Sequence, residues 1–225
     1  MESRQTQIKR VAAKLFVEHG IAGTSVRDIA DGVGMLSGSL YHHFPSKDAI
    51  AFAIVNDFLA DLNSRYESVL PHVNGTREEF GALVRSSIQV ATAHPYATEI
   101  YQNERAYHGP EAPTQISDAV EHAHRFWLRT ATQASHRGDL RTDLDPVEFA
   151  RMLREGVWWS VRYHRDQLAD TGPTVAGALL AVFLDGALAG TPAPSVATSS
   201  DPQGLSDRID QIESRLDILA RHLEG

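Results

Sequence analysis

Apolar side chains recur at helical spacing from close to the start of the chain. The apolar positions that share one helical face there are Ile8, Val11, Ala12, Leu15 and Phe16. Together with a following Gly20, they predict an amphipathic helix from about Arg4 to His19 that ends at the glycine.

Two short helices joined by a glycine turn are expected next. Ser25 and Asp28 have the spacing of a capping box, in which each side chain bonds the backbone N–H of the other residue. Gly34 marks the turn that follows this helix. Ser37 is expected to cap the second short helix.

Longer helices are predicted for the rest of the chain. Pro45 breaks the chain, and Ser46 is placed to cap a helix from Lys47 to about Leu70. Asp145 and Pro146 form a strong start signal, a cap followed by the residue favoured in the first turn. Further helical patterns cover Thr76–Ala93, Ala112–His136, Pro146–His164 and Thr174–Ala189, with a short irregular piece around Tyr96–Arg105. No stretch alternates with a period of two for long, so the sequence predicts an all-α protein.

The last 35 residues have a different composition. Residues 191–204, TPAPSVATSSDPQG, hold three prolines and mostly small or polar residues, which predicts a flexible linker. In residues 205–225, leucine and isoleucine recur at alternating intervals of four and three, as in a short coiled coil. This tail either pairs between chains, giving assemblies beyond a dimer, or folds back on its own body as an amphipathic helix.

Composition narrows the class of protein. Hydrophobic residues make up 42% and charged residues 22% of the 225 residues, as in ordinary globular proteins. No apolar run approaches the roughly 20 residues of a membrane span, and the N-terminus lacks a signal-peptide core. The chain contains no cysteine. These features predict a cytoplasmic protein without a membrane partner, and we expect no metal site and no cofactor.

Charge is unevenly distributed. Residues 1–50 carry six lysines and arginines against five acids, a net charge of +1, whereas the remaining residues carry 15 against 24, a net of −9. The two parts together give the net charge of −8. If the protein binds DNA, only the first fifty residues are suited to it, because the rest repels phosphate.

Residues 24–47, TSVRDIADGVGMLSGSLYHHFPSK, carry the side chains best suited to DNA. A helix-turn-helix unit places its second helix in the major groove, while neighbouring helices hold phosphates. The residues expected at the DNA interface are Thr24, Ser25, Arg27, Ser37, Gly38, Ser39, Tyr41, His42, His43 and Lys47. The alternative is a surface helical hairpin in which the aromatic side chains only pack.

The order of these residues resembles the signature of the TetR family of bacterial repressors. The segments T-[ST]-V-R-D-I-A, a glycine turn and G-[ST]-L-Y-x-H-F-x-[ST]-K correspond to Thr24–Ala30, Gly32–Gly34 and Gly38–Lys47. The resemblance implies a homodimer with a three-helix DNA-binding head, residues 1–48, and a ligand-binding and dimerisation body, residues 49–190. By the same resemblance Tyr41 and Lys47 contact phosphates, and Arg27, Ser37, Ser39 and His42 are candidates for base or phosphate contacts.

The family resemblance also places the dimer interface on the last two helices of the body. The apolar face expected there consists of Val175, Ala178, Leu179, Val182, Phe183 and Ala187. A two-fold dimer would hold two recognition helices about one DNA turn apart, so its operator should be palindromic.

An aromatic stretch in the body, Val157–His164, is the candidate ligand site. It holds two tryptophans, a tyrosine and an arginine, which suit an apolar ligand with an anionic end. The residues expected to bind the ligand are Tyr101, Gln102, Phe126, Trp127, Trp158, Trp159, Arg162 and Tyr163. Because adjacent tryptophans point to different faces of a helix, at least one of the pair is expected in the core or the dimer interface.

A second resemblance concerns the ligand. Gly34–Phe44 together with Trp159–Tyr163 is similar to the actinobacterial repressors of cholesterol-ring catabolism, which respond to a CoA thioester of a steroid fragment. It implies a similar inducer, with Arg162 and nearby cations meeting the CoA phosphates or a carboxylate. The linker and tail depart from that pattern.

The sequence thus predicts a homodimeric repressor that binds a palindromic DNA operator and is released by a small apolar or acyl-CoA inducer. A helical ligand carrier or an enzyme with a non-functional head is the first alternative. We expect no enzyme, because no nucleophile–base pair, glycine-rich phosphate loop or HExxH motif is present. The second alternative is a DNA-binding protein that no ligand regulates.

Overall fold

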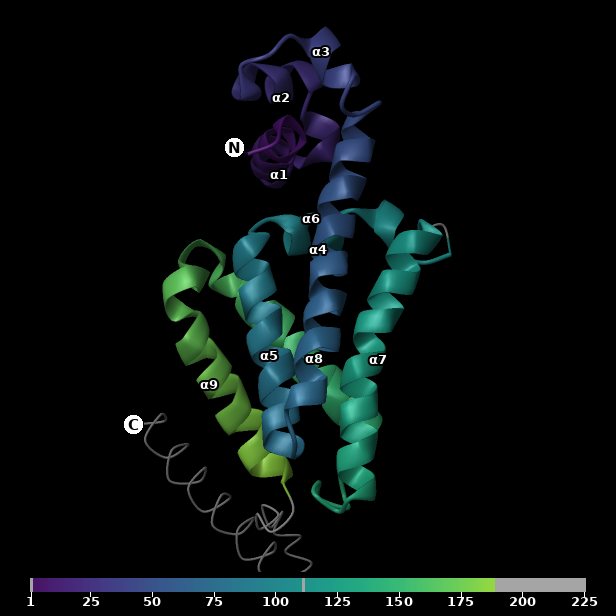
Figure 1. Ribbon diagram of the computed structural model, residues 1–225, viewed down its shortest axis with the longest axis vertical. Helices are drawn as coiled ribbons and strands as arrows, with labels where there is room; N and C mark the ends of the chain where they lie inside the picture. The colour runs from purple at the N-terminus through teal and green to yellow at the C-terminus, as the bar shows by residue number, and fades with distance from the viewer. Residues whose placement is uncertain (1, 111, 189–225) are drawn as a thin grey trace, which may run out of the picture. The chain divides into compact units, whose positions relative to one another are not determined.

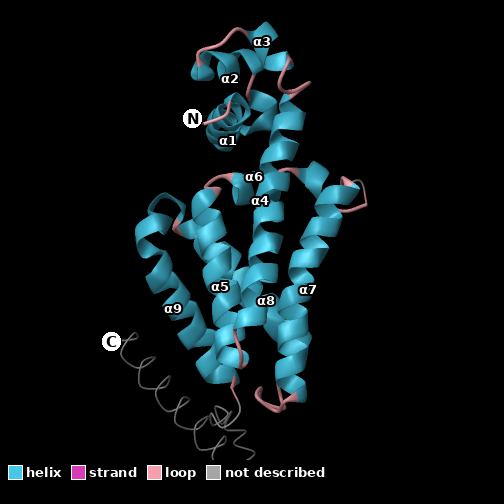
Figure 2. Ribbon diagram, in the orientation of Figure 1, coloured by secondary structure: helices cyan, strands magenta, loops and turns pink. Residues whose placement is uncertain are grey.

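The computed structural model describes residues 2–110 and 112–188, which fold almost entirely into helices (Figures 1 and 2). Within those ranges the all-α prediction is confirmed, since the only strand-like pairing is one isolated bridge between Leu140 and Leu188. The linker, residues 191–204, and the heptad tail, residues 205–225, lie outside the described residues.

Three helices form the head and six the described part of the body. The head helices are α1 (Arg4–Gly23), α2 (Val26–Val33) and α3 (Ser37–Tyr41). The body helices are α4 (Lys47–Val69), α5 (Thr76–Ala93), α6 (Ala97–Asn103), α7 (Thr114–His136), α8 (Pro146–Tyr163) and α9 (Leu168–Ala187). Short 3₁₀ turns cover Leu70–His72, Arg105–Tyr107 and Arg165–Gln167.

Most predicted helix boundaries agree with the structure to within two residues, and three need correction. Helix α1 resumes after Gly20 and runs to Gly23, although Gly20 itself breaks it with φ 74° and ψ 159°. The piece expected to be irregular contains α6, because Ala97 and Ile100 are buried on one helical face. Helix α9 begins at Leu168, before the predicted Thr174, and the buried Leu168 keeps the turn ahead of Pro173 helical.

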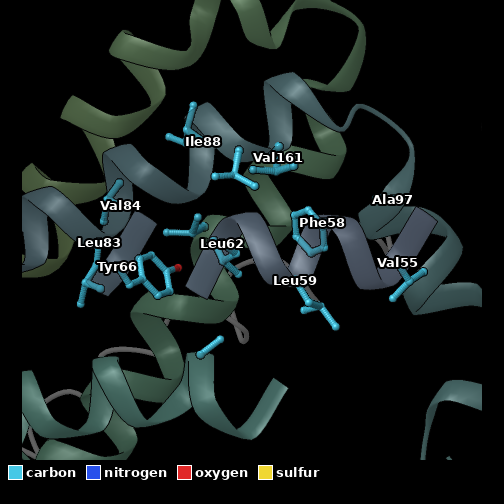
Figure 3. Close-up of a cluster of buried hydrophobic side chains, with 14 of the residues drawn as sticks. Val55, Phe58, Leu59, Leu62, Tyr66, Leu83, Val84, Ile88, Ala97 and Val161 are labelled. Atoms are coloured by element: carbon cyan, nitrogen blue, oxygen red, sulfur yellow. The ribbon is translucent and has the colours of Figure 1, made fainter. Parts of the chain in front are cut away.

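Helix α4 connects the head to the body and forms the centre of the core. Figure 1 shows α1–α3 at one end of α4, and α5, α6 and α7 pack along its remaining length. Figure 3 shows apolar side chains of α4, among them Phe58 and Leu62, together with Ile88 of α5 and Val161 of α8. A displacement of α4 within the body would therefore move the head.

A buried hydrogen-bonded chain fixes α4 against α5 and α7. Trp127 Nε1 donates to Tyr66 Oη at 3.2 Å, Tyr66 Oη lies 2.5 Å from Ser87 Oγ, and Ser87 Oγ donates to Leu83 O at 2.8 Å. Because the Ser87 hydroxyl donates its proton to Leu83 O, Tyr66 Oη is the donor in its hydrogen bond with Ser87 Oγ. Burial raises the pKa of Tyr66 to about 12, so its hydroxyl stays protonated at neutral pH.

We expect Tyr66→Phe to lower the free energy of unfolding by about 1–3 kcal/mol, because the buried Trp127 Nε1 loses its acceptor. The urea midpoint at one fixed protein concentration measures the loss. Tyr41→Phe is the matched control, since Tyr41 is exposed and its variant should unfold like the wild type. An unchanged midpoint for Tyr66→Phe would contradict the role given to this chain of bonds.

Candidate functional site

Helix α2 begins with the predicted capping box. Asp28 N donates to Ser25 Oγ at 3.1 Å, and Ser25 N and Oγ donate to Asp28 Oδ2 at 2.9 Å and 2.7 Å. These bonds from Ser25 lower the pKa of Asp28. The box fixes where α2 starts and so where the exposed Arg27, in its first turn, projects.

The turn between α2 and α3 depends on a glycine. Gly34 has φ 70° and ψ 46°, a left-handed conformation that residues with a Cβ rarely adopt. The N–H of Met35 then donates to Ala30 O at 3.0 Å, which closes the end of α2. Helix α3 follows directly and lies at the outer end of the head (Figure 1).

Most of the predicted DNA contacts share the outside of the head. Ser25, Arg27, Gly38, Tyr41 and His42 are exposed, and Ser37, Ser39, His43 and Lys47 are partly buried. The structure thus brings these residues to the surface of α2, α3 and the start of α4. Their contacts with DNA remain predictions.

Two of the side chains predicted to contact DNA form hydrogen bonds within the head. Thr24 is buried, and its hydroxyl lies 2.8 Å from Gly20 O and 3.2 Å from Leu15 O, so it donates back into α1. Thr24 was expected at the DNA interface, and for its hydroxyl the structure corrects that prediction. Lys47 Nζ donates to Ala22 O and Thr24 O, both at 3.0 Å, which leaves one of its three protons for a phosphate.

The prediction that Ser37 caps α3 is wrong, and Leu36 is an exposed residue beside α3 that was not predicted at the DNA interface. Leu36, not Ser37, occupies the N-cap position, and no side chain caps the helix. The side chain of Leu36 is 79% exposed. A leucine directly before the recognition helix, where a serine or threonine is preferred, was the signal that could have identified it.

The body contains a cavity of about 270 Å³ between α4, α6, α7 and α8. Its apolar lining consists of Phe58, Leu59, Leu62, Tyr66, Val120, Ala123, Trp127 and Trp158. Its polar lining consists of Thr98, Tyr101, Gln102, His108, His124, Arg154 and Glu155. A mostly apolar wall with a few convergent polar groups is typical of small-molecule sites.

Four of the eight predicted ligand residues line this cavity, namely Tyr101, Gln102, Trp127 and Trp158. The other four do not. Phe126 packs edge to face on Tyr66 with a centroid distance of 5.5 Å, and the ring of His122 stacks on it at 5.1 Å. Arg162 Nη1 reaches Gln102 Oε1 at 3.5 Å, which places the arginine next to a lining residue.

The two tryptophans of α8 point in different directions, as expected of neighbours on a helix. Trp158 meets Phe58 edge to face at 5.7 Å in the cavity wall, whereas Trp159 is 67% exposed. Trp159 stacks on Tyr163 with a centroid distance of 5.5 Å, and Tyr163 is 72% exposed. The prediction that Trp159 and Tyr163 line a ligand cavity within one chain is therefore corrected.

Arg154 is the cavity residue that the sequence alone did not indicate. Its side chain is 13% exposed, and Nη2 donates to Glu155 Oε1 at 3.0 Å. Its Nε is buried without a hydrogen-bond partner among the described residues. A buried guanidinium with an unused donor can hold an anionic or carbonyl oxygen. Its position one turn before Trp158 on α8 was the available signal.

His124 adds a neutral imidazole to the same wall. Burial, and then the positive charge of Arg154, lower the pKa of His124 to about 4. Glu155 and Glu121 act in the opposite direction but do not outweigh these effects. At neutral pH the fixed positive charge in the lining therefore comes from Arg154.

The pKa of His124 predicts a pH dependence of stability. Between about pH 6.5 and pH 4 the unfolded chain binds a proton that the native chain does not, so stability falls as pH falls through this window. We expect His124→Gln to lose less stability than the wild type between about pH 7 and pH 4.5. Urea midpoints at several pH values test this, with the exposed His136→Gln as control. Parallel curves for wild type and His124→Gln would contradict the assignment.

Helices α8 and α9 carry apolar side chains that are exposed among the described residues. Within the predicted face of α9, Val175, Leu179 and Ala187 turn inward, whereas Ala178 and Val182 are exposed. Exposed Met152, Trp159 and Tyr163 lie on α8. Residues Arg165–Ala187 form a helical segment that is long and apolar enough to cross a membrane by length and composition alone. Core helices of soluble proteins meet the same criterion, so this is weak evidence for a membrane span.

Comparison with known proteins agrees with this arrangement. Residues 8–54 match the family described as bacterial regulatory proteins, tetR family. The HTH-type transcriptional repressor KstR2 of Rhodococcus jostii is 38% identical over 185 residues, which cover 81% of this chain and 90% of the relative. KstR2 of Mycobacterium tuberculosis is 34% identical over 188 residues, 83% of this chain and 94% of the relative.

Solved structures give the same result. The ketosteroid transcriptional regulator KstR2 of Mycobacterium tuberculosis superposes with a TM-score of 0.76 at 34% identity, covering 84% of this chain and 96% of that chain. PfmR, a TetR family regulator of Thermus thermophilus, has a TM-score of 0.70 at 23% identity and shows likeness of fold, covering 79% of this chain and 96% of that chain. The chain belongs to the TetR family of bacterial regulatory proteins.

Proposed function

We propose that the protein is a cytoplasmic, homodimeric transcriptional repressor whose hold on a palindromic operator is weakened when a small molecule enters the body. One observation carries the proposal: the same chain joins a helix-turn-helix head to an apolar cavity with a buried, incompletely bonded Arg154. Relatives that match nearly their whole length are named transcriptional repressors, which supports it.

The ligand chemistry follows from the cavity. About 270 Å³ is at the small end of ligand sites and suits a compact ring system, not a whole CoA thioester. Tyr101, Gln102 and Arg154 offer hydrogen bonds to ketone or carboxylate oxygens, which is compatible with the ketosteroid named for a relative. In a steroid-derived CoA thioester the ring fragment would fill the cavity. The CoA part would lie outside it, with Arg162 beside Gln102 as a phosphate partner.

Helix α6 gives the ligand a route to the head. Its residues Thr98, Tyr101 and Gln102 line the cavity, while the helix packs against α1 and α4. A ligand that pushes α6 would therefore act on the first helix of the head. The ligand shifts the equilibrium only by its difference in affinity for the two arrangements.

The dimer is assigned to α8 and α9. Exposed Met152, Trp159, Tyr163 and Val182 provide large apolar contacts, and small Ala178 permits close approach of helices. Tryptophan and tyrosine are the residues that most often dominate interface energies. A dimer is needed because one head, with a net charge of only +1, gains little from phosphate attraction.

A mobility-shift titration tests the proposal as a whole. The DNA is the intergenic segment beside the protein's own gene, and the added molecule is a CoA thioester of a two-ring steroid fragment. Retarded DNA that is released by the thioester supports the proposal, with free CoA as control. Binding that the thioester does not change would leave a DNA-binding protein that this ligand does not regulate. Absence of any sequence-specific complex would refute the repressor assignment.

A further inference from the structure

Leu36 exposes more of its side chain than any other large apolar residue in the described part of the chain. Its exposed fraction is 79%, compared with 74% for Val182 and 53% for Tyr41. Val182 belongs to the proposed dimer surface, so its exposure in one chain has an explanation. Leu36 belongs to the head and not to the α8 and α9 helices of that surface. Its exposure therefore has no explanation in the proposed dimer.

The fold uses the backbone of Leu36 but not its side chain. With φ −74° and ψ 142° it is the N-cap of α3, and its carbonyl accepts hydrogen bonds from Ser39 N at 2.9 Å and Leu40 N at 3.2 Å. A serine, threonine or aspartate there would also cap the helix with its side chain, which leucine cannot do. The preceding Met35 already packs against the core of the head. Leucine is thus a poor choice for stability at this position.

The position of Leu36 is well suited to reading bases. Residues at the start of a recognition helix face base edges in the major groove. The apolar group on the floor of that groove is the C5-methyl group of thymine, which cytosine lacks. The exposed polar neighbours Arg27 and His42 can bond other base edges or phosphates, but they cannot recognise a methyl group.

We propose that Leu36 of each head covers the C5-methyl group of one thymine in each half of the operator. This makes Leu36 a specificity-determining residue, and the inference rests on the proposed repressor function. Covering one methyl group is expected to raise the affinity about four-fold, from the free energy of burying one such carbon. Because the dimer applies two heads, the effect on a palindromic operator is about fifteen-fold.

The test removes the methyl group and the leucine separately. The operator is the intergenic segment beside the protein's own gene that the protein protects from nuclease. It is synthesised once with thymidine and once with deoxyuridine, which differs only in lacking the methyl group. Dissociation constants are measured at one salt concentration for wild type and Leu36→Ala. We expect deoxyuridine to weaken the wild type about fifteen-fold more than Leu36→Ala.

Two further variants keep the result interpretable. Leu36→Ser can cap α3, so it should keep the thermal midpoint of the wild type or raise it, yet lose the preference for thymidine. Leu128→Ala removes an exposed leucine of α7 and should behave as wild type on both DNAs. Single deoxyuridine substitutions then locate the base.

The outcomes separate the inference from the proposed function. If wild type and Leu36→Ala lose the same factor on deoxyuridine DNA, other residues read the methyl groups and the inference about Leu36 is wrong, while the repressor assignment stands. If the wild type binds neither DNA with sequence preference, the proposed function fails and the inference fails with it.

Discussion

Trp159→Asp is expected to be monomeric and to lose at least about a hundred-fold in operator affinity. Trp159 is 67% exposed and lies flat against the ring of Tyr163, an arrangement that presents a large apolar surface to a partner. An aspartate at the same place on two facing subunits would bring like charges together inside an apolar interface. Sedimentation gives the oligomeric state, and fluorescence anisotropy on the operator gives the affinity.

The loss of affinity follows from the charge of the head. A single head has a net charge of +1, so most of the binding free energy must come from engaging two half-sites at once. Leu128→Asp is the matched control, because Leu128 is an exposed leucine of α7 and is not one of the α8 and α9 residues of the proposed dimer surface. It should remain dimeric and bind DNA normally. A dimeric Trp159→Asp protein would show that the interface lies elsewhere.

Arg154→Met is expected to bind the operator normally but to respond to the inducer only at about hundred-fold higher concentration. Arg154 supplies the fixed positive charge of the cavity lining, and its Nε has no partner among the described residues. Methionine keeps a long apolar stem in place while removing the charge and the donors. Titrating the thioester into a preformed protein–DNA complex measures the response.

The control for Arg154 lies one turn earlier on the same helix. Arg151 is exposed and bonds Glu148 at 2.9 Å, so Arg151→Met removes an arginine of α8 without touching the cavity. It should release DNA at the wild-type inducer concentration. An unchanged inducer response in Arg154→Met would exclude Arg154 as the partner of the ligand. Loss of DNA binding in that variant would instead indicate that Arg154 supports the fold.

The head was predictable from sequence because its signals are local. The capping box of Ser25 and Asp28, the left-handed Gly34 and the cap at Ser46 each depend on neighbours within a few residues. Most helix boundaries in the body were predictable for the same reason, whereas α6 and the start of α9 were not. Thr24 shows where such reasoning fails. From the sequence, its hydroxyl could donate either to a DNA phosphate or to a backbone carbonyl. The folded structure shows that it donates to Gly20 O.

The cavity was predictable only in part, because it is formed by four helices that are far apart in sequence. The aromatic stretch of α8 correctly indicated Trp158, but the rotation of α8 decides that Trp158 lines the cavity and Trp159 does not. Arg154 lies one turn before Trp158 and Arg162 one turn after it, so the sequence alone could not decide which arginine lines the cavity. Burial alone separates them, and burial depends on contacts across the body.

The length of α4 sets how small a movement can release DNA. Its 23 residues form one continuous helix about 34 Å long, which carries the head at one end and the cavity-lining Phe58 to Tyr66 in its other half. A tilt of about 5° over that length moves the far end by about 3 Å, which is close to the 3.4 Å rise between neighbouring base pairs. Two heads displaced in opposite directions would then miss their half-sites by more than one base step. A ligand therefore does not need to unfold or separate the subunits to end repression.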